Sequence, residues 1–355
     1  MAIYKQLLYE SSGTSWHLTG VSDRQFYPSL FLLAISFAGR GRAKKRTSVA
    51  TILQEAADLL IHFDQRPNAT LAWNGRYERA PSHHKRGLTE LMALGITAHC
   101  ATLYGWDPRR HHMFGFDDLQ LVDDQWTERV RAWVAPGVRP DILFETPAGL
   151  RAMESRGRTV QRQARSKPTS QQEKRLSELE GWASSVGVQI AADPAWGMCW
   201  ASFSRTSTLV DLFDPGEPVS LDRRLRVGLD NLRMRLRPAA QYARTEEDAK
   251  VLDVRDQTGR VYRSFVLALS DAQSAIRYIA ICVPEAKSSA SVRVDVGAFQ
   301  GPEILVSERG RTEWLQRDGW LFVVSTRADL DIDGIGADLA WVVRSEVRRS
   351  GLAVP

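Results

Sequence analysis

The stretch RPDILFETPAGLRAMESRGR, residues 139–158, decides the fold of the central part of this chain. Its apolar residues alternate on either side of a Thr-Pro-Ala-Gly sequence, which predicts two strands joined by a tight turn. In such a hairpin Asp141 begins the first strand and Glu154 lies toward the far end of the second. We therefore expect the two carboxylates to converge at one end of a sheet.

Two carboxylates beside a backbone carbonyl form the hard oxygen site that Mg²⁺ or Mn²⁺ prefers. An ion held there can generate hydroxide and stabilise the transition state of phosphodiester hydrolysis. The residues alone also allow a purely structural interpretation, in which Pro140 and Asp141 form a strand-entry turn. In that case Glu154 pairs with Arg151 on a solvent-exposed face, and Arg156 and Arg158 belong to a surface run of charges.

Three helices are predicted around the hairpin. Apolar residues recur at helical spacing over residues 49–63 and 82–106, and a third helix is expected over 170–186, with Ser170 as its N-cap and Glu173 completing a capping box. Short strand-like runs follow the third helix. The order helix, strand, hairpin, helix, strand is that of a compact α/β unit.

The chain has 355 residues, which indicates two or three domains at roughly 100–200 residues each. Changes in hydrophobic periodicity divide the chain into three parts: an N-terminal helical accessory region (1–81), the α/β unit (82–215) and a β-rich α+β module (216–355). A Pro- and Gly-rich segment separates the last two. The fold class is therefore α/β in the core and α+β overall, with a central mixed sheet flanked by helices.

The net charge of +5 is modest, but the basic residues are clustered. The clusters lie at residues 40–46, from 151 through 175, and in an arginine-rich stretch from 223 to 244. Clustered cations favour a polyanionic partner, although each cluster alone could equally be a solvated face. The candidate nucleic-acid contacts are Arg40, Arg42, Lys44, Lys45, Arg46, Arg158, Arg162, Arg165 and Lys167.

Pro140-Asp141, followed after about a dozen residues by Glu154-Ser155-Arg156-Gly157-Arg158 and then a helix, resembles the PD-(D/E)XK, or restriction-endonuclease-like, nuclease superfamily over about residues 82–205. The resemblance implies that Asp141 and Glu154 bind a divalent metal, with the carbonyl of Ser155 as a further ligand. It also implies an upstream helical carboxylate, for which Glu90 is the best candidate.

The same resemblance implies a glutamine near the start of the following helix, which Gln171 or Gln172 would supply. The family's catalytic lysine is replaced here by Arg156. Arginine keeps the positive charge near the scissile phosphate but cannot be deprotonated. Two functions therefore remain open: an active Mg²⁺- or Mn²⁺-dependent DNA endonuclease, and a degenerate nuclease-like subunit that binds DNA or assembles with a partner without cleaving.

Clustering of Glu90, Asp141, Glu154 and Arg156 would favour the enzyme, and a remote Glu90 would favour the binding subunit. The resemblance implies a partner subunit or a homodimer, in restriction, transposition or phage defence. Glycine-rich phosphate loops, G-x-S-x-G and H-E-x-x-H motifs are absent from the sequence. Three widely spaced cysteines and the lack of a long apolar run predict a cytoplasmic chain outside the membrane.

Overall fold

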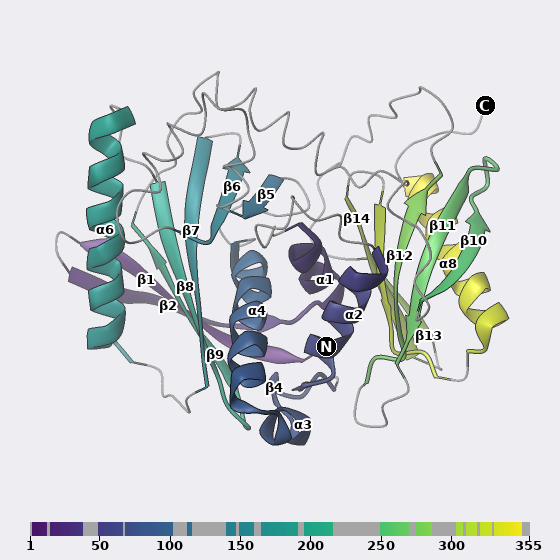
Figure 1. Cartoon of the computed structure of the whole chain (residues 1–355), viewed down its shortest axis with the longest axis horizontal. Coiled ribbons are helices and arrows are strands. Elements are labelled where there is room, and N and C mark those ends of the chain that lie inside the picture. Colours follow the sequence, from purple (N-terminus) through teal and green to yellow (C-terminus); the bar gives the residue numbers. More distant parts are fainter. Residues whose placement is uncertain are drawn as a thin grey trace. The chain divides into compact units, whose positions relative to one another are not determined.

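The protein is a mixed α+β chain that divides into two compact units in a computed structural model (Figure 1). The first unit comprises Met1–Phe26, Ala34–Lys45 and His62–Leu236, and the second comprises Tyr27–Leu33, Arg46–Ile61 and Arg237–Pro355. The structure describes residues 2–12, 15–37, 49–66, 68–101, 112–115, 140–146, 149–159, 165–190, 195–215, 249–269, 275–285, 303–307, 310–317, 320–328 and 330–349.

The first unit is built on a seven-stranded mixed sheet in the order β2-β1-β9-β8-β7-β6-β5. Its strands are β1 (Ile3–Ser12), β2 (Ser15–Gln25), β5 (His112–Gly115), β6 (Ile142–Thr146), β7 (Gly149–Arg158), β8 (Ala195–Phe203) and β9 (Thr208–Asp214). Strands β3 (Phe63–Asp64) and β4 (Ala72–Trp73) pair separately, and the helices are α3 (Gly75–Arg79), α4 (Ser82–Ala101) and α6 (Ser170–Ile190).

The predicted hairpin forms strands β6 and β7, which lie between the central strand β8 and the edge strand β5. Strands β5, β6 and β7 pair antiparallel in sequence order, and Ile142 faces Met153 across β6 and β7. Strand β8 then pairs parallel to β7, which requires the crossover that α6 provides. Strand β9 pairs antiparallel to β8 and parallel to β1, so the N-terminal hairpin of β1 and β2 extends the same sheet.

Helices α4 and α6 cover opposite faces of the sheet. On the α4 side the hydroxyl of Thr97 donates to the hydroxyl of Ser155 at 2.8 Å. On the α6 side Arg175 contacts Glu154. Since successive strand residues point to opposite faces, the even-numbered residues 154 and 156 of β7 lie toward α6 and the odd-numbered residues 155 and 157 lie toward α4.

The two expected helices of this unit are confirmed, with one correction at the start of α6. The reciprocal capping bonds join Thr169 and Gln172: the Thr169 amide donates to the Gln172 side-chain oxygen at 2.9 Å, and the Gln172 amide is 3.4 Å from the Thr169 hydroxyl. Ser170 is the first helical residue instead of the cap. The capping box is therefore displaced by one residue, because a glutamine in the third helical position closes it as well as a glutamate does.

The second unit contains a six-stranded antiparallel sheet in the order β10-β11-β12-β15-β14-β13. Its strands are β10 (Lys250–Arg255), β11 (Val261–Ala268), β12 (Tyr278–Pro284), β13 (Glu303–Ser307), β14 (Gly310–Arg317) and β15 (Trp320–Ser325). Helix α8 (Ile332–Arg349) packs its Leu339, Val342 and Val343 into one core cluster, and α2 (Val49–Leu60) contacts β11 and β12. Helix α1 (Pro28–Phe37) contributes residues to both units.

The N-terminal segment differs from the expected division at residue 81. Strands β1 and β2 belong to the central sheet of the first unit, whereas residues 46–61 belong to the second unit together with the C-terminal strands. Residues 1–81 therefore do not form an accessory region of their own. Strand pairing between residues some two hundred positions apart leaves no local signal in the sequence, which explains the difference.

Candidate functional site

Asp141 and Glu154 are brought together at the start of β6, as the hairpin pattern predicts. The Asp141 amide donates to the carbonyl of Met153 at 3.0 Å, which sets the register of the two strands at this end. One carboxylate oxygen of Asp141, Oδ2, accepts a hydrogen bond from the amide of Ser155 at 2.8 Å. The carboxylate of Asp141 is exposed at this point and lies beside the backbone that carries Glu154.

Glu154 is completely buried and held by two arginines. Its Oε1 lies 2.6 Å from Nε of Arg156 and accepts hydrogen bonds from Nη2 of Arg175 at 2.6 Å and from Nε of Arg175 at 2.9 Å. Its other oxygen, Oε2, is buried and has no hydrogen-bond partner among the described residues. The solvent-exposed pair with Arg151 is thereby excluded, because Arg151 is itself buried and forms its ion pair with Asp214.

The electrostatic environment of Glu154 follows from this burial. Loss of hydration and, after it, the negative charge of Asp141 raise the pKa of Glu154, while Arg156 and Arg175 lower it, and the net result is a pKa of about 7. Near neutral pH the carboxyl group is therefore poised between its protonated and ionised forms. A third cation, near Oε2, would favour the carboxylate form, so the ionisation of Glu154 is sensitive to a positively charged ligand.

Arg175 is the site residue that sequence reasoning missed. It lies on α6, is 15% exposed, and its Nη1 donates to Glu178 at 2.9 Å, so the guanidinium is fixed from its own helix while it binds Glu154. A signal was present in the sequence. Arg175 stands three residues after Gln172 and beside the apolar Leu176 and Leu179, which places it on the buried side of the helix.

Glu90 is not part of this cluster. It lies on α4 and pairs with Arg86 across one helical turn at 3.0 Å, with its side chain 60% exposed. Helix α4 covers the Ser155 and Gly157 face of β7, whereas Glu154 points to the opposite face, toward α6. The expected carboxylate thus lies on the wrong side of the sheet to join Asp141 and Glu154.

The glutamines at the start of α6 have separate roles. Gln171 is exposed and accepts a hydrogen bond from Arg158, whose guanidinium lies 4.6 Å from the ring centroid of Trp200. Gln172 is buried, and its amide donates to Asp211 of β9 at 2.5 Å. Only Gln171 of the two is accessible, and it neighbours Arg158 rather than the Asp141–Glu154 pair.

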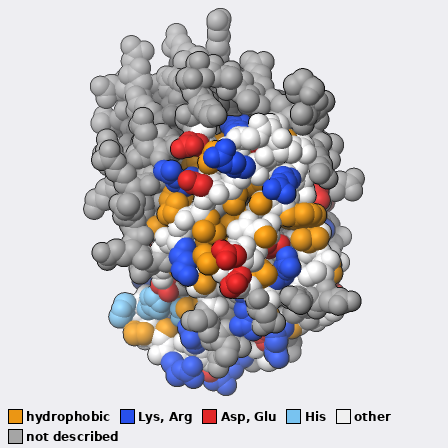
Figure 2. All heavy atoms as spheres, turned by 90° about the vertical axis from the view of Figure 1, so that its right-hand side faces the viewer, with side chains coloured by type: hydrophobic (Ala, Val, Ile, Leu, Met, Phe, Trp, Pro, Cys, Tyr) orange, Lys and Arg blue, Asp and Glu red, His pale blue; other side chains and the backbone are white. Residues whose placement is uncertain are grey.

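The other predicted nucleic-acid contacts are only partly within the structure. Arg165 and Lys167 are exposed just before α6, and the hydroxyl of Tyr9 donates to the carbonyl of Arg165 at 2.7 Å. Figure 2 shows a different face, on which basic and acidic side chains are interspersed among hydrophobic ones. The residues outside the described part are Arg40, Arg42, Lys44, Lys45, Arg46 and Arg162.

The Asp141–Glu154 pair fits a divalent cation in its donor chemistry. The described residues contain no group of three or more His, Cys, Asp or Glu side chains that could hold a metal. Mg²⁺, however, is commonly held by one or two carboxylates, with water and substrate phosphates as its other ligands. The buried Oε2 of Glu154, which has no partner among the described residues, together with the neighbouring Asp141 carboxylate offers oxygen donors of the kind that such an ion binds.

Comparisons with protein-family models, with curated proteins and with solved structures found no match to this chain. Within the described part of the chain, every helix is too short or too polar to cross a lipid bilayer. The function must therefore be argued from the site itself.

Proposed function

We propose that this chain is a metal-dependent endonuclease that hydrolyses phosphodiester bonds in DNA. The observation that carries the proposal is the buried Glu154 carboxylate, whose Oε2 has no partner among the described residues while Asp141 lies close enough to raise its pKa. A buried carboxylate oxygen without a hydrogen-bond donor, beside a second carboxylate, is costly unless a cation approaches it. The pair is thus best explained as one half of a cation site.

The order of elements supports the same assignment. Helix α4, the antiparallel strands β5, β6 and β7, the crossover helix α6 and the parallel strand β8 follow the arrangement expected of a restriction-endonuclease-like core. Within it, Asp141 immediately precedes the second of the three strands and Glu154 lies on the third. The proposed fold and the proposed site thus involve the same strands.

Asp141, Glu154 and the carbonyl of Ser155 would hold Mg²⁺ or Mn²⁺, which supplies activation of water and stabilisation of charge on the phosphate. Arg175 fixes the Glu154 carboxylate through Oε1 and leaves Oε2 available. Arg156, with 44% of its side chain exposed, touches the same Oε1 and can offer its remaining donors to a phosphate oxygen. Because arginine stays protonated, its role is to neutralise charge and not to transfer a proton.

The position of Glu90 favours a second candidate, a nuclease-like subunit that binds DNA without cleaving it. Two guanidinium groups already balance the charge of Glu154, and the third carboxylate lies across the sheet on α4. In that case the basic residues around α6 would grip the phosphate backbone, and a partner subunit would carry the catalytic activity.

Incubation of the full chain with supercoiled plasmid, linear duplex and single-stranded DNA, with Mg²⁺ or Mn²⁺, tests the two candidates. The control is the Asp141→Ala, Glu154→Ala double variant. Cleavage that needs the metal and is lost in the double variant supports the endonuclease. Salt-sensitive binding without cleavage, equal in both proteins, supports the binding subunit.

The wider setting follows from the same reasoning. Cutting both strands of a duplex needs two active sites, so we propose a homodimer or a partner subunit in a restriction, transposition or phage-defence system. Three buried free thiols, Cys100, Cys199 and Cys282, are compatible with the reducing cytoplasm in which such systems act. Analytical ultracentrifugation with and without DNA tests the assembly.

A further inference from the structure

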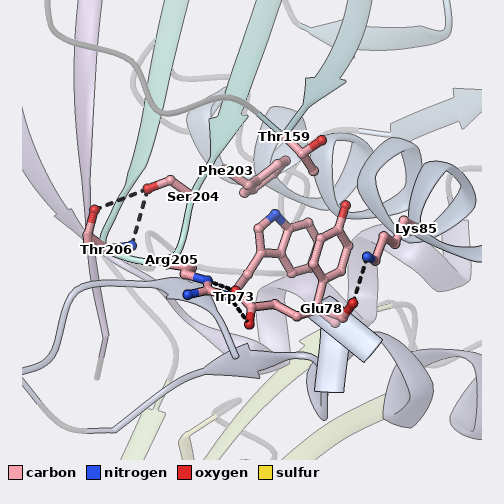
Figure 3. Close-up of a pocket in the computed structure, with 9 residues that line it drawn as sticks. Trp73, Glu78, Lys85, Thr159, Phe203, Ser204, Arg205 and Thr206 are labelled. Carbon is pink, nitrogen blue, oxygen red and sulfur yellow. Dashed lines mark hydrogen bonds and ion pairs between the residues drawn. The ribbon is translucent and has the colours of Figure 1, made fainter. Parts of the chain in front are cut away.

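A cavity of about 540 Å³ opens in the first unit, where β7 and β8 end. Figure 3 shows its walls: Thr159 follows the last residue of β7, Phe203 is the last residue of β8, and Arg205 lies in the turn to β9. Trp73 of β4 and Tyr77 of α3 line another wall. Lys85 projects from the first turn of α4. The cavity is large enough for a small organic ligand.

The inner wall of the cavity is aromatic and rigid. The rings of Trp73 and Tyr77 stack with their centroids 3.6 Å apart and their planes 9° apart, and Phe203 packs 5.2 Å from Trp73. The indole Nε1 of Trp73 is buried and has no hydrogen-bond partner among the described residues. In Figure 3 this nitrogen points to the region between Phe203 and Thr159. The wall therefore combines an apolar surface with one unsatisfied donor, a combination that favours an aromatic ligand with acceptor atoms.

The rim of the cavity carries two cations. Nζ of Lys85 donates to the carbonyl of Glu78 at 2.7 Å and lies 5.7 Å from the Tyr77 ring centroid. Arg205, with 77% of its side chain exposed, forms an ion pair with the Glu78 carboxylate. One carboxylate balances only one of the two cations, so the rim keeps a net positive charge. Ser204 and Thr206 lie beside Arg205, but their hydroxyl groups bond one another at 3.3 Å and the Ser204 hydroxyl donates to the carbonyl of Ser207 at 3.0 Å, so the two cations are the main donors of the rim.

From this chemistry we infer that the cavity binds a nucleotide. Its base lies against the aromatic wall of Trp73, Tyr77 and Phe203, and its phosphate lies between Lys85 and Arg205. Aromatic rings and cations are the two elements that recognise a single nucleotide unit without regard to sequence. The ligand is either a free mononucleotide or an unpaired residue of a nucleic-acid strand. Binding of a strand rests on the proposed nuclease function, whereas binding of a free mononucleotide does not.

Isothermal titration calorimetry of the full chain with adenosine 5′-monophosphate, adenosine and inorganic phosphate tests the inference. We expect the monophosphate to bind more tightly than either part alone. Arg205→Ala and Lys85→Ala should each weaken its binding by about tenfold, the worth of one charge-assisted hydrogen bond. Arg66→Ala is the matched control, because Arg66 is 71% exposed and also pairs with a nearby carboxylate, Asp64, away from the cavity.

Glu78→Gln is the decisive variant. It removes the carboxylate that competes for Arg205, so monophosphate binding should tighten severalfold, an effect that general loss of structure cannot produce. A single-stranded oligonucleotide that competes with the monophosphate identifies a strand as the source, and failure to compete identifies the free nucleotide. The inference is overturned if neither the monophosphate nor the oligonucleotide binds, or if Arg66→Ala weakens binding of the monophosphate as much as Arg205→Ala does.

The same titrations with the Asp141→Ala, Glu154→Ala variant keep this inference distinct from the proposed nuclease function. Unchanged nucleotide binding with lost cleavage supports both. Nucleotide binding in a wild-type chain that never cleaves supports the cavity and contradicts the nuclease. If the wild-type chain cleaves DNA but binds neither the monophosphate nor the oligonucleotide in the cavity, only the inferred nucleotide site is contradicted.

Discussion

Gly157 of β7 lies directly against the backbone of Thr89 in α4, so closely that a Cβ atom at position 157 would come within 2.3 Å of the Thr89 carbonyl oxygen. This contact explains why α4 can lie flat on the sheet beside Ser155. It also fixes which face of β7 the helix covers, and hence leaves Glu154 and Arg156 on the other face.

Gly157→Ala should therefore destabilise the first unit by about 1–3 kcal/mol, because the helix backbone cannot yield as a flexible side chain could. Urea denaturation followed by circular dichroism measures the loss. Gly181→Ala in α6 is the matched control, since nothing lies within 4 Å of its added Cβ, and it should stabilise the helix by up to about 1 kcal/mol. Equal stability of the two variants would show that α4 does not pack as described.

Glu90→Ala should leave Mg²⁺-dependent cleavage within about twofold of the wild type, because Glu90 pairs with Arg86 on the α4 side of the sheet. Asp141→Ala should reduce the cleavage rate by at least about a hundredfold, since it removes a proposed metal ligand. Initial rates on supercoiled plasmid provide the comparison. A loss in Glu90→Ala as large as that in Asp141→Ala would place Glu90 in the site and refute the separation of faces.

Arg175→Ala should shift the pH dependence of metal binding upward. The guanidinium of Arg175 lowers the pKa of Glu154 against the effect of burial, so without it the carboxylate forms only at higher pH. Mn²⁺ titrations across pH 5.5–9 should place the midpoint of binding about one pH unit higher than in the wild type. Arg175→Lys should restore part of the shift, and Arg86→Ala, which breaks an exposed ion pair elsewhere, should leave the midpoint unchanged.

Glu313→Gln should alter the pH dependence of stability in the second unit. Burial raises the pKa of Glu313 to about 7, although Ser29 donates to its Oε1 from both its amide and its hydroxyl. A carboxyl group whose folded pKa is raised stabilises the fold fully below its unfolded pKa of about 4.5, and that contribution is lost as the pH rises through 7.

The wild type should therefore lose up to about 3 kcal/mol of unfolding free energy relative to Glu313→Gln between pH 4.5 and 8. The glutamine keeps an acceptor for Ser29, so the comparison isolates the ionisation. Denaturant titrations at a series of pH values measure it. Parallel pH profiles for the two proteins would contradict the raised pKa.

Local patterns in the sequence were enough to predict the hairpin and the meeting of Asp141 with Glu154. The alternation of β6 and β7 and the turn between them fix that geometry within twenty residues. The starts of α2, α4 and α6 were equally visible in their periodicity. Even the cap of α6 was misplaced by only one residue, from Thr169 to Ser170.

Features that depend on tertiary packing could not be read in the same way. Glu90 occurs in a helix that begins where expected, at Ser82, but its side of the sheet depends on the contact between Thr89 and Gly157. The parallel neighbour of β1 is β9, about two hundred residues later, and no local pattern in the sequence predicts that pairing. Arg175 lies on the apolar side of its helix, but the helical pattern does not tell that its guanidinium reaches Glu154, because that contact depends on how α6 packs on the sheet.

The parallel pairing of β1 with β9 also bears on how the chain folds as it is synthesised. Residues 5–10 can pair with β2 early, but they cannot pair with β9 until the chain has been synthesised through Asp214, and α2 is completed later still by β11 and β12. The N-terminal hairpin and α2 thus spend much of translation without the strands that cover their apolar surfaces, a period in which aggregation competes with folding. Fragments cut at residue 81 or 215 would each lack strands or helices that the other holds.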